Sequence, residues 1–167
     1  MRKLFFALVV AISAVAGAQA QSKIAHMSAQ KVLDTMPSRR AAISDIKTVE
    51  AMGMKELRDL DSAIQVEVAN YQANATKWSP VVLRATEQKI QGMQQRLEER
   101  EQQINQQLQE MSADMNDKIL DKVKKAVDIV AKKKGLNYVI DESATLFSSG
   151  TDITNEVITE VLKLEKQ

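Results

Sequence analysis

The chain has 167 residues, with 23 Lys and Arg against 22 Asp and Glu, no Cys, one His and one Trp. Its nearly balanced charge is unlike the basic surplus of a general nucleic-acid-binding protein. The absence of Cys excludes a disulfide framework and thiol chemistry, so the stability of this single domain's length of chain has to come from packing or assembly.

Residues 1–20 predict a secretory signal peptide. Basic residues at 2–3 precede an apolar stretch at 4–15 and an Ala-Gln-Ala cleavage signal. An uncleaved membrane anchor is the alternative, but the apolar stretch is shorter than the ~20 residues of a spanning helix. No Cys follows the cleavage signal, so no lipid can be attached there. The mature chain is expected to begin at Gln21 with a net charge of −1, since 21 basic residues then remain against 22 acidic ones.

A short strand and a short helix are predicted next. Residues 23–27, Lys-Ile-Ala-His-Met, alternate in polarity as a strand does, with Ile24 and His26 expected on opposite faces. Ser28 is the expected N-cap of a helix over 29–36, which Pro37 ends or kinks.

Residues 37–134 predict an antiparallel α-helical hairpin. Apolar residues recur at steps of three and four along both halves, which is the pattern of a coiled-coil seam. Glu50 and Gly53 fall on predicted seam positions, so weak packing is expected there. Residues 76–83, which include Pro80, interrupt the pattern and are the expected tip. Three acid-first pairs indicate the solvated side of the second half: Asp114 with Lys118, Asp121 with Lys125, and Asp128 with Lys132.

The C-terminal region predicts two strands and a helix. Gly135 follows three Lys residues, as expected at a helix C-terminus. Strands are predicted over 137–141 and 145–149, separated by a turn. A helix is predicted over 155–163, with Thr154 as its N-cap.

The order of these elements predicts an α+β fold. Strands from both chain ends have to meet in one small sheet, so residues 21–36 and 135–167 are expected to form a β-rich oligomerisation body. The hairpin leaves this body as an arm. A body of this size has exposed sheet edges, which favours homo-oligomerisation.

Both ends of the chain resemble the Skp/OmpH family of periplasmic chaperones of Gram-negative bacteria. The matching stretches are Lys23 to Met27, Val32 with Leu33, residues 37–42 and, most specifically, the run KKKGLNYVIDESATLFSSGTDITNEVITEVL. The arms match in length and helicity rather than by residue. The resemblance implies a homotrimer whose strands build one shared barrel, with three hairpin arms around a central cavity.

The resemblance also implies a function. It implies an ATP-independent holdase that binds unfolded outer-membrane proteins in the periplasm, with the insertion machinery of the outer membrane as a further candidate partner. No cofactor, nucleic acid or stable membrane insertion is expected. Well-known members are strongly basic whereas this mature chain is nearly neutral, so no lipopolysaccharide site is transferred.

An enzyme is not expected, because one His, no Cys and no Gly-rich loop leave neither a nucleophile with its base nor a phosphate cradle. The alternative function is that of a structural envelope adaptor whose coiled-coil hairpin docks one fixed partner. Adaptors of that kind normally carry further β-rich domains, and none is visible in this sequence.

Two sets of apolar residues are candidate binding sites. The first set lies on the predicted hairpin and includes Met, which is suited to adaptable contact with varied apolar partners. The alternative for these residues is that they pack within the tip and the seam. The candidate client-binding residues are Trp78, Val81, Val82, Leu83, Met52 and Met54. The candidate residues of the oligomerisation body are Ile24, Tyr138, Val139, Ile140, Leu146 and Phe147.

Charged residues have two interpretations. His26 is expected to be structural or at the surface rather than a ligand, and Asp141 with Glu142 a polar turn rather than a cation site. The basic residues near the body are either solvated helix faces or a basic cavity wall that attracts acidic client segments. They are Arg39, Arg40, Lys122, Lys124, Lys125 and residues 132–134.

Overall fold

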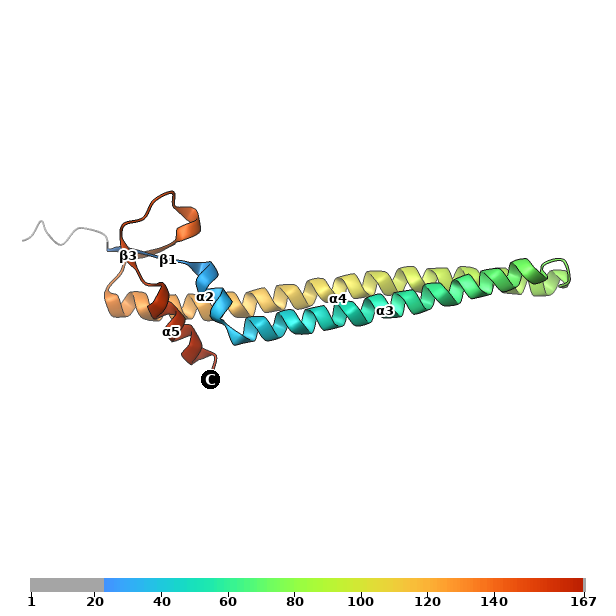
Figure 1. Ribbon diagram of the computed structural model, residues 1–167, viewed down its shortest axis with the longest axis horizontal. Helices are drawn as coiled ribbons and strands as arrows, with labels where there is room; N and C mark the ends of the chain where they lie inside the picture. Colours follow the sequence, from blue (N-terminus) through green and yellow to red (C-terminus); the bar gives the residue numbers. More distant parts are fainter. Residues whose placement is uncertain (1–22, 167) are drawn as a thin grey trace, which may run out of the picture. The chain divides into compact units, whose positions relative to one another are not determined.

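The computed structural model describes residues 23–166, so the predicted signal peptide at 1–20 lies outside the described residues. The described residues form two compact units, one made of residues 37–120 and the other of the residues before 37 together with those from 121 onward. In chain order the elements are β1 (Ile24–Met27), α2 (Ala29–Thr35), α3 (Pro37–Asn74), α4 (Pro80–Lys134), β2 (Tyr138–Asp141), the 3-10 turn η1 (Glu142–Ala144), β3 (Thr151–Asp152) and α5 (Thr154–Leu164) (Figure 1). No helix within 23–166 has the length and apolar character needed to cross a membrane.

The unit of residues 37–120 is a helical hairpin. Figure 1 shows α3 and α4 running side by side, and residues 75–79 connect them. The predicted seam is buried at Ile64 and Ile104. One predicted seam residue is wrong: Glu50 is exposed and Val49 is half-buried in its place. Val49 keeps the steps of three and four between Ile46 and Gly53 while avoiding burial of a carboxylate.

Gly53 itself lies in close contact with α4, although Met52 and Met54 on either side of it are exposed. A Cβ atom on Gly53 would lie only 2.8 Å from Cγ2 of Ile104. Ile104 is itself buried. The missing side chain therefore lets α3 and α4 approach closely, which is a use of glycine that the seam pattern alone does not reveal.

Local chemistry explains where α4 begins and ends. Pro80 is its first residue, where a missing N–H costs nothing. The hydroxyl of Ser79 caps this end by accepting a hydrogen bond from the Val82 N–H at 3.4 Å. At the other end Gly135 has φ +64°, and the Leu136 N–H donates to the Ala131 carbonyl at 2.9 Å. The helix therefore ends at the predicted glycine, and its hydrogen bonds form a Schellman motif.

The other unit contains a three-stranded sheet of order β2-β1-β3 in which both outer strands run parallel to β1. The strand predicted at 145–149 is wrong, because the third strand is Thr151–Asp152. A short turn cannot join parallel strands, because the chain has to run back along the sheet to the end at which both strands begin. Residues 142–150 make this crossover connection between β2 and β3.

The two faces of β1 differ. Ala25 and Met27 are buried, whereas Ile24 is exposed and His26 is half-buried on the other side. The expectation that Ile24 and His26 face opposite ways is therefore wrong, because residues two apart on a strand share a face. The buried face belongs to a core completed by Val32, Met36, Val123, Ala126, Val130, Ile153, Val157 and Val161.

Hydrogen bonds from backbone N–H groups to side-chain oxygens join the two chain ends. Ser28 caps α2 as predicted, since its hydroxyl accepts from the Lys31 N–H. The Ser28 N–H in turn donates to Oγ1 of Thr154 at 2.9 Å in a buried position. Thr154 is therefore not the N-cap of α5, which begins one residue earlier than predicted. Asp152 instead accepts the Thr154 N–H at 2.8 Å.

Candidate functional site

Apolar side chains are exposed on the helical hairpin outside its seam. Met52 is 67% exposed and Val81 is 72% exposed, with Met54 and Val82 also exposed. None of these four side chains is buried in the seam between α3 and α4. Trp78 and Leu83, the other two predicted client-binding residues, are half-buried.

The hairpin tip combines packing with exposure. The rings of Trp78 and Tyr71 meet edge to face, with centroids 6.3 Å apart and an interplanar angle of 68°. The Tyr71 hydroxyl donates a hydrogen bond to Glu87, which raises the pKa of Tyr71. Trp78 therefore closes the tip by packing on Tyr71, while Val81 at the start of α4 remains available for contact with another molecule.

A hollow of about 170 Å³ lies beside Met52 and Gly53 on the hairpin. Arg100 borders it and binds both carboxylate oxygens of Glu56 at 2.9 Å, from α4 to α3. This forked hydrogen bond lowers the pKa of Glu56. The hollow thus places an apolar thioether next to a charged pair, a surface suited to varied partner side chains.

The sheet-containing unit also exposes apolar residues. Ile24, Tyr138 and Ile140 are exposed on the sheet, and Val139 is half-buried. On the crossover connection Leu146 is fully exposed and Phe147 is 84% exposed. A single copy of the chain therefore leaves most of the predicted oligomerisation residues in contact with solvent.

Most of the described lysines near the end of α4 have acidic partners. The three predicted acid-first pairs, Asp114 with Lys118, Asp121 with Lys125 and Asp128 with Lys132, are confirmed as ion pairs at 2.7 Å. Lys122 pairs with Glu165 at 2.7 Å, and Lys134 pairs with Glu156. These partners neutralise much of the basic cluster and favour the interpretation of α4 as a solvated helix face over that of a basic cavity wall.

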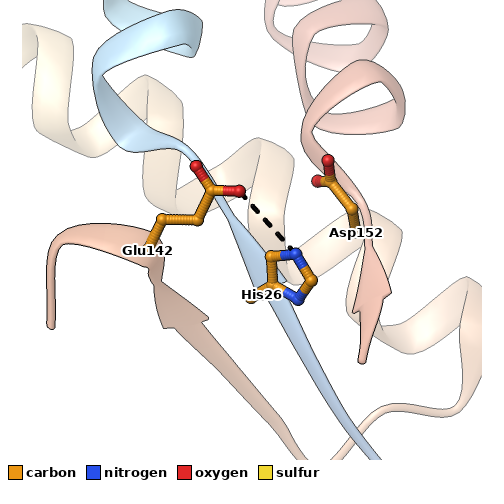
Figure 2. Close-up of side chains that lie close together, drawn as sticks. All are labelled: His26, Glu142 and Asp152. Carbon is orange, nitrogen blue, oxygen red and sulfur yellow. Dashed lines mark ion pairs between the residues drawn. The ribbon is translucent and has the colours of Figure 1, made fainter. Parts of the chain in front are cut away.

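Three residues of the sheet-containing unit form a cluster that sequence reasoning missed. His26, Glu142 and Asp152 lie close together although more than a hundred residues separate His26 from the other two (Figure 2). The Nε2 atom of His26 is 3.7 Å from Oε1 of Glu142. Asp141 behaves as the predicted turn former, since its carboxylate accepts from the Ser143 N–H. The parallel pairing of β1 with β3 sets His26 beside Asp152, and that of β1 with β2 brings the following turn with Glu142 near them; no local pattern reveals this pairing.

Comparison with known proteins places the chain in a family. The family model described as "Outer membrane protein (OmpH-like)" matches residues 23–161. Two proteins named "Chaperone protein Skp", from Photorhabdus laumondii subsp. laumondii and Photorhabdus luminescens, are 25% and 26% identical over 153 residues. Each alignment covers 91% of this chain and 93% of the relative.

A solved structure supports the fold. The crystal structure of a putative outer membrane chaperone (OmpH-like) from Caulobacter crescentus matches with a TM-score of 0.75 over 86% of each chain. Its 14% sequence identity makes this a likeness of fold. Both sequence relatives are named as chaperones, so the prediction that the chain is not an enzyme is confirmed. The matched model spans most of the described residues, and the chain therefore belongs to the OmpH-like family of chaperones.

Proposed function

We propose that the chain is an ATP-independent holdase chaperone of the Gram-negative periplasm. It binds unfolded outer-membrane proteins in a cavity between helical arms and prevents their aggregation. The observation that carries this proposal is the set of apolar side chains exposed on the hairpin of an OmpH-like family member: Met52, Met54, Val81 and Val82. Trp78 and Leu83 complete the proposed client-binding surface.

These side chains suit transient binding of varied clients. Each offers only a small apolar area, so a single contact contributes little free energy. Several arms around one client make the contacts multivalent, which raises the overall affinity while each contact stays reversible. A chaperone that has to release its client without ATP needs this combination of many weak contacts.

A homotrimer is part of the proposal. Leu146 and Phe147 are apolar and exposed in the single chain, as are Ile24, Tyr138 and Ile140 on the sheet. β3 has only two residues and both outer strands have free edges within the described sheet. Pairing of such edges and burial of such side chains between copies would provide the shared barrel that anchors the arms.

The proposed organisation assigns a role to each segment. Residues 1–20 direct export, residues 21–36 and 135–167 form the assembly body, and residues 37–134 form the arm with its tip near 76–83. Clients are handed on to the insertion machinery of the outer membrane.

The decisive experiment is suppression of aggregation. Several unrelated outer-membrane barrel proteins are diluted from urea with and without the purified chain, in the absence of nucleotide, and light scattering is recorded. A holdase suppresses scattering of all of them, whereas an adaptor that docks one fixed partner acts on one or on none.

A surface variant then tests the binding residues. Replacing Met52, Met54, Val81 and Val82 together by Ser should weaken holding without loss of helix content, because these side chains are exposed. The matched control replaces the exposed polar residues Gln72 and Gln88 of the same hairpin by Ser and should hold clients like the wild type. Equal holding by both variants would exclude the assigned surface.

A further inference from the structure

The side chains of His26, Glu142 and Asp152 converge on one side of the sheet (Figure 2). One ligand atom from each residue lies within 4.8 Å of the other two, and His26 Nε2 is 3.7 Å from Glu142 Oε1. We propose that this cluster is a binding site for a divalent first-row transition-metal ion, with Zn²⁺ as the probe. The proposal stands independently of the holdase function.

Sheet register places two of the three donors side by side. His26 on β1 is the register partner of Asp152 on β3 and of Ile140 on β2. Glu142 is the first residue of η1, directly after β2, and its Oε1 lies 3.7 Å from Nε2 of His26. The Ile153 N–H donates to the His26 carbonyl at 3.0 Å, which fixes the position of β3 against β1. Backbone pairing therefore sets His26 beside Asp152, and the Glu142 side chain reaches them from the turn that follows β2.

The donor set selects a class of metal ion. One imidazole nitrogen with two carboxylates suits Zn²⁺ and its neighbours, whereas Ca²⁺ and Mg²⁺ prefer sites made of oxygen alone. Ligands at about 2.1 Å around a tetrahedral Zn²⁺ are about 3.4 Å apart. The His26–Glu142 separation of 3.7 Å is close to that value, and all three donor atoms lie within 4.8 Å of one another. Side-chain rotation would have to shorten the remaining separations by up to about 1.4 Å to close the site.

The two carboxylates of the cluster differ in their hydrogen bonding. Oδ1 of Asp152 accepts hydrogen bonds from the N–H and the hydroxyl of Thr154, which orient the carboxylate. Such outer hydrogen bonds commonly hold a metal ligand in place. The Glu142 carboxylate accepts no hydrogen bond from residues 23–166, so its oxygens are available to an ion.

Exposure leaves a path for the ion. The His26 side chain is 12% exposed and the Glu142 side chain is 36% exposed. The site is therefore covered on the sheet side and open near Glu142, where water can complete the coordination. A bound ion would tie the start of the 142–150 crossover, which bears Leu146 and Phe147, to the two strands beside it.

The test measures Zn²⁺ binding to the untagged chain at neutral pH by isothermal titration calorimetry. One Zn²⁺ per chain is expected. Because His26 is the only His in the sequence, zinc X-ray absorption should show one imidazole ligand together with oxygen ligands. Replacing Glu142→Gln or His26→Gln should lower the affinity at least about tenfold.

Glu101→Gln is the matched control, because it removes an exposed carboxylate from α4, and its affinity should equal that of the wild type. Circular dichroism of the His26 and Glu142 variants checks that each is folded, and Glu142→Gln provides the test if His26→Gln is not. Equal Zn²⁺ affinity of Glu142→Gln and the wild type, or a spectrum without an imidazole ligand, would overturn the proposal and leave surface binding only.

Discussion

Replacing Gly53 by Ala tests the close approach of α3 and α4. In an open helix this change should stabilise the fold, because Ala is favoured over Gly by about 0.8–1.0 kcal/mol in a helix interior. At Gly53, however, the new Cβ would lie 2.8 Å from Cγ2 and 3.1 Å from Cδ1 of Ile104. Cγ2 is attached directly to the Ile104 Cβ and cannot swing away without a change of rotamer or a shift of the helix.

The two effects oppose each other. Overpacking of a filled core costs about 1–3 kcal/mol, which exceeds the gain in helix propensity. Gly53→Ala is therefore expected to destabilise the chain by about 1 kcal/mol. Gly92 provides the matched control, because nothing lies within 4 Å of the Cβ position there. Gly92→Ala should stabilise the chain by about 0.5–1 kcal/mol.

The assay is urea and thermal unfolding followed by the helical circular dichroism signal at a fixed protein concentration. A change of 1 kcal/mol corresponds to about 2–4 °C in melting temperature for a chain of this size. Ile104→Ala should cost less in the Gly53→Ala background than alone, because the new methyl group fills part of the space. If Gly53→Ala raises the melting temperature as much as Gly92→Ala does, the two helices do not approach closely at Gly53 and the reasoning is refuted.

Three further predictions concern the tip, the joined chain ends and the cross-helix ion pair. Trp78→Ala removes the edge-to-face contact with Tyr71 and should lower stability by at least about 0.5–1.5 kcal/mol in urea melts; unchanged melts with weaker holding would assign Trp78 to client contact instead. Thr154→Val leaves the buried Ser28 N–H without its acceptor and should cost about 1–3 kcal/mol, and an unchanged urea midpoint would show that this hydrogen bond contributes little. The hydrogen bond from Arg100 lowers the pKa of Glu56 below its usual 4.5 in the folded chain. Ionised Glu56 therefore stabilises the folded state at pH values above the unfolded pKa, and this stabilisation is lost as the pH falls through the lowered folded pKa. Glu56→Gln should therefore flatten the loss of stability as the pH falls below 4.5, and acid melts identical to those of the wild type would contradict this.

Local patterns predicted the helices because helix formation is governed by nearby residues. The spacing of apolar residues gave the two long helices, Ser28 was correctly identified as a cap, and Gly135 as a helix end. The charge pairs at intervals of seven residues were also correct, since they depend only on helix geometry. Each of these features needs no knowledge of distant residues.

Features set by distant partners were missed. Leu146 and Phe147 look like strand residues, but strand pairing with β1 is made by Thr151 and Asp152. The hydroxyl of Thr154 was expected to cap its own helix, whereas it accepts the N–H of Ser28 from the other end of the chain. The approach of Glu142 to His26 also follows from the parallel sheet, which a pattern of neighbouring residues does not specify.

The most direct test of the central claim is native mass spectrometry of the mature chain mixed with an unfolded outer-membrane barrel protein, without nucleotide. The proposal predicts a free assembly of three chains and a complex of three chains with one client. Detection of only monomeric chains, or of trimers that carry no client while the client aggregates, would contradict the proposed trimeric holdase.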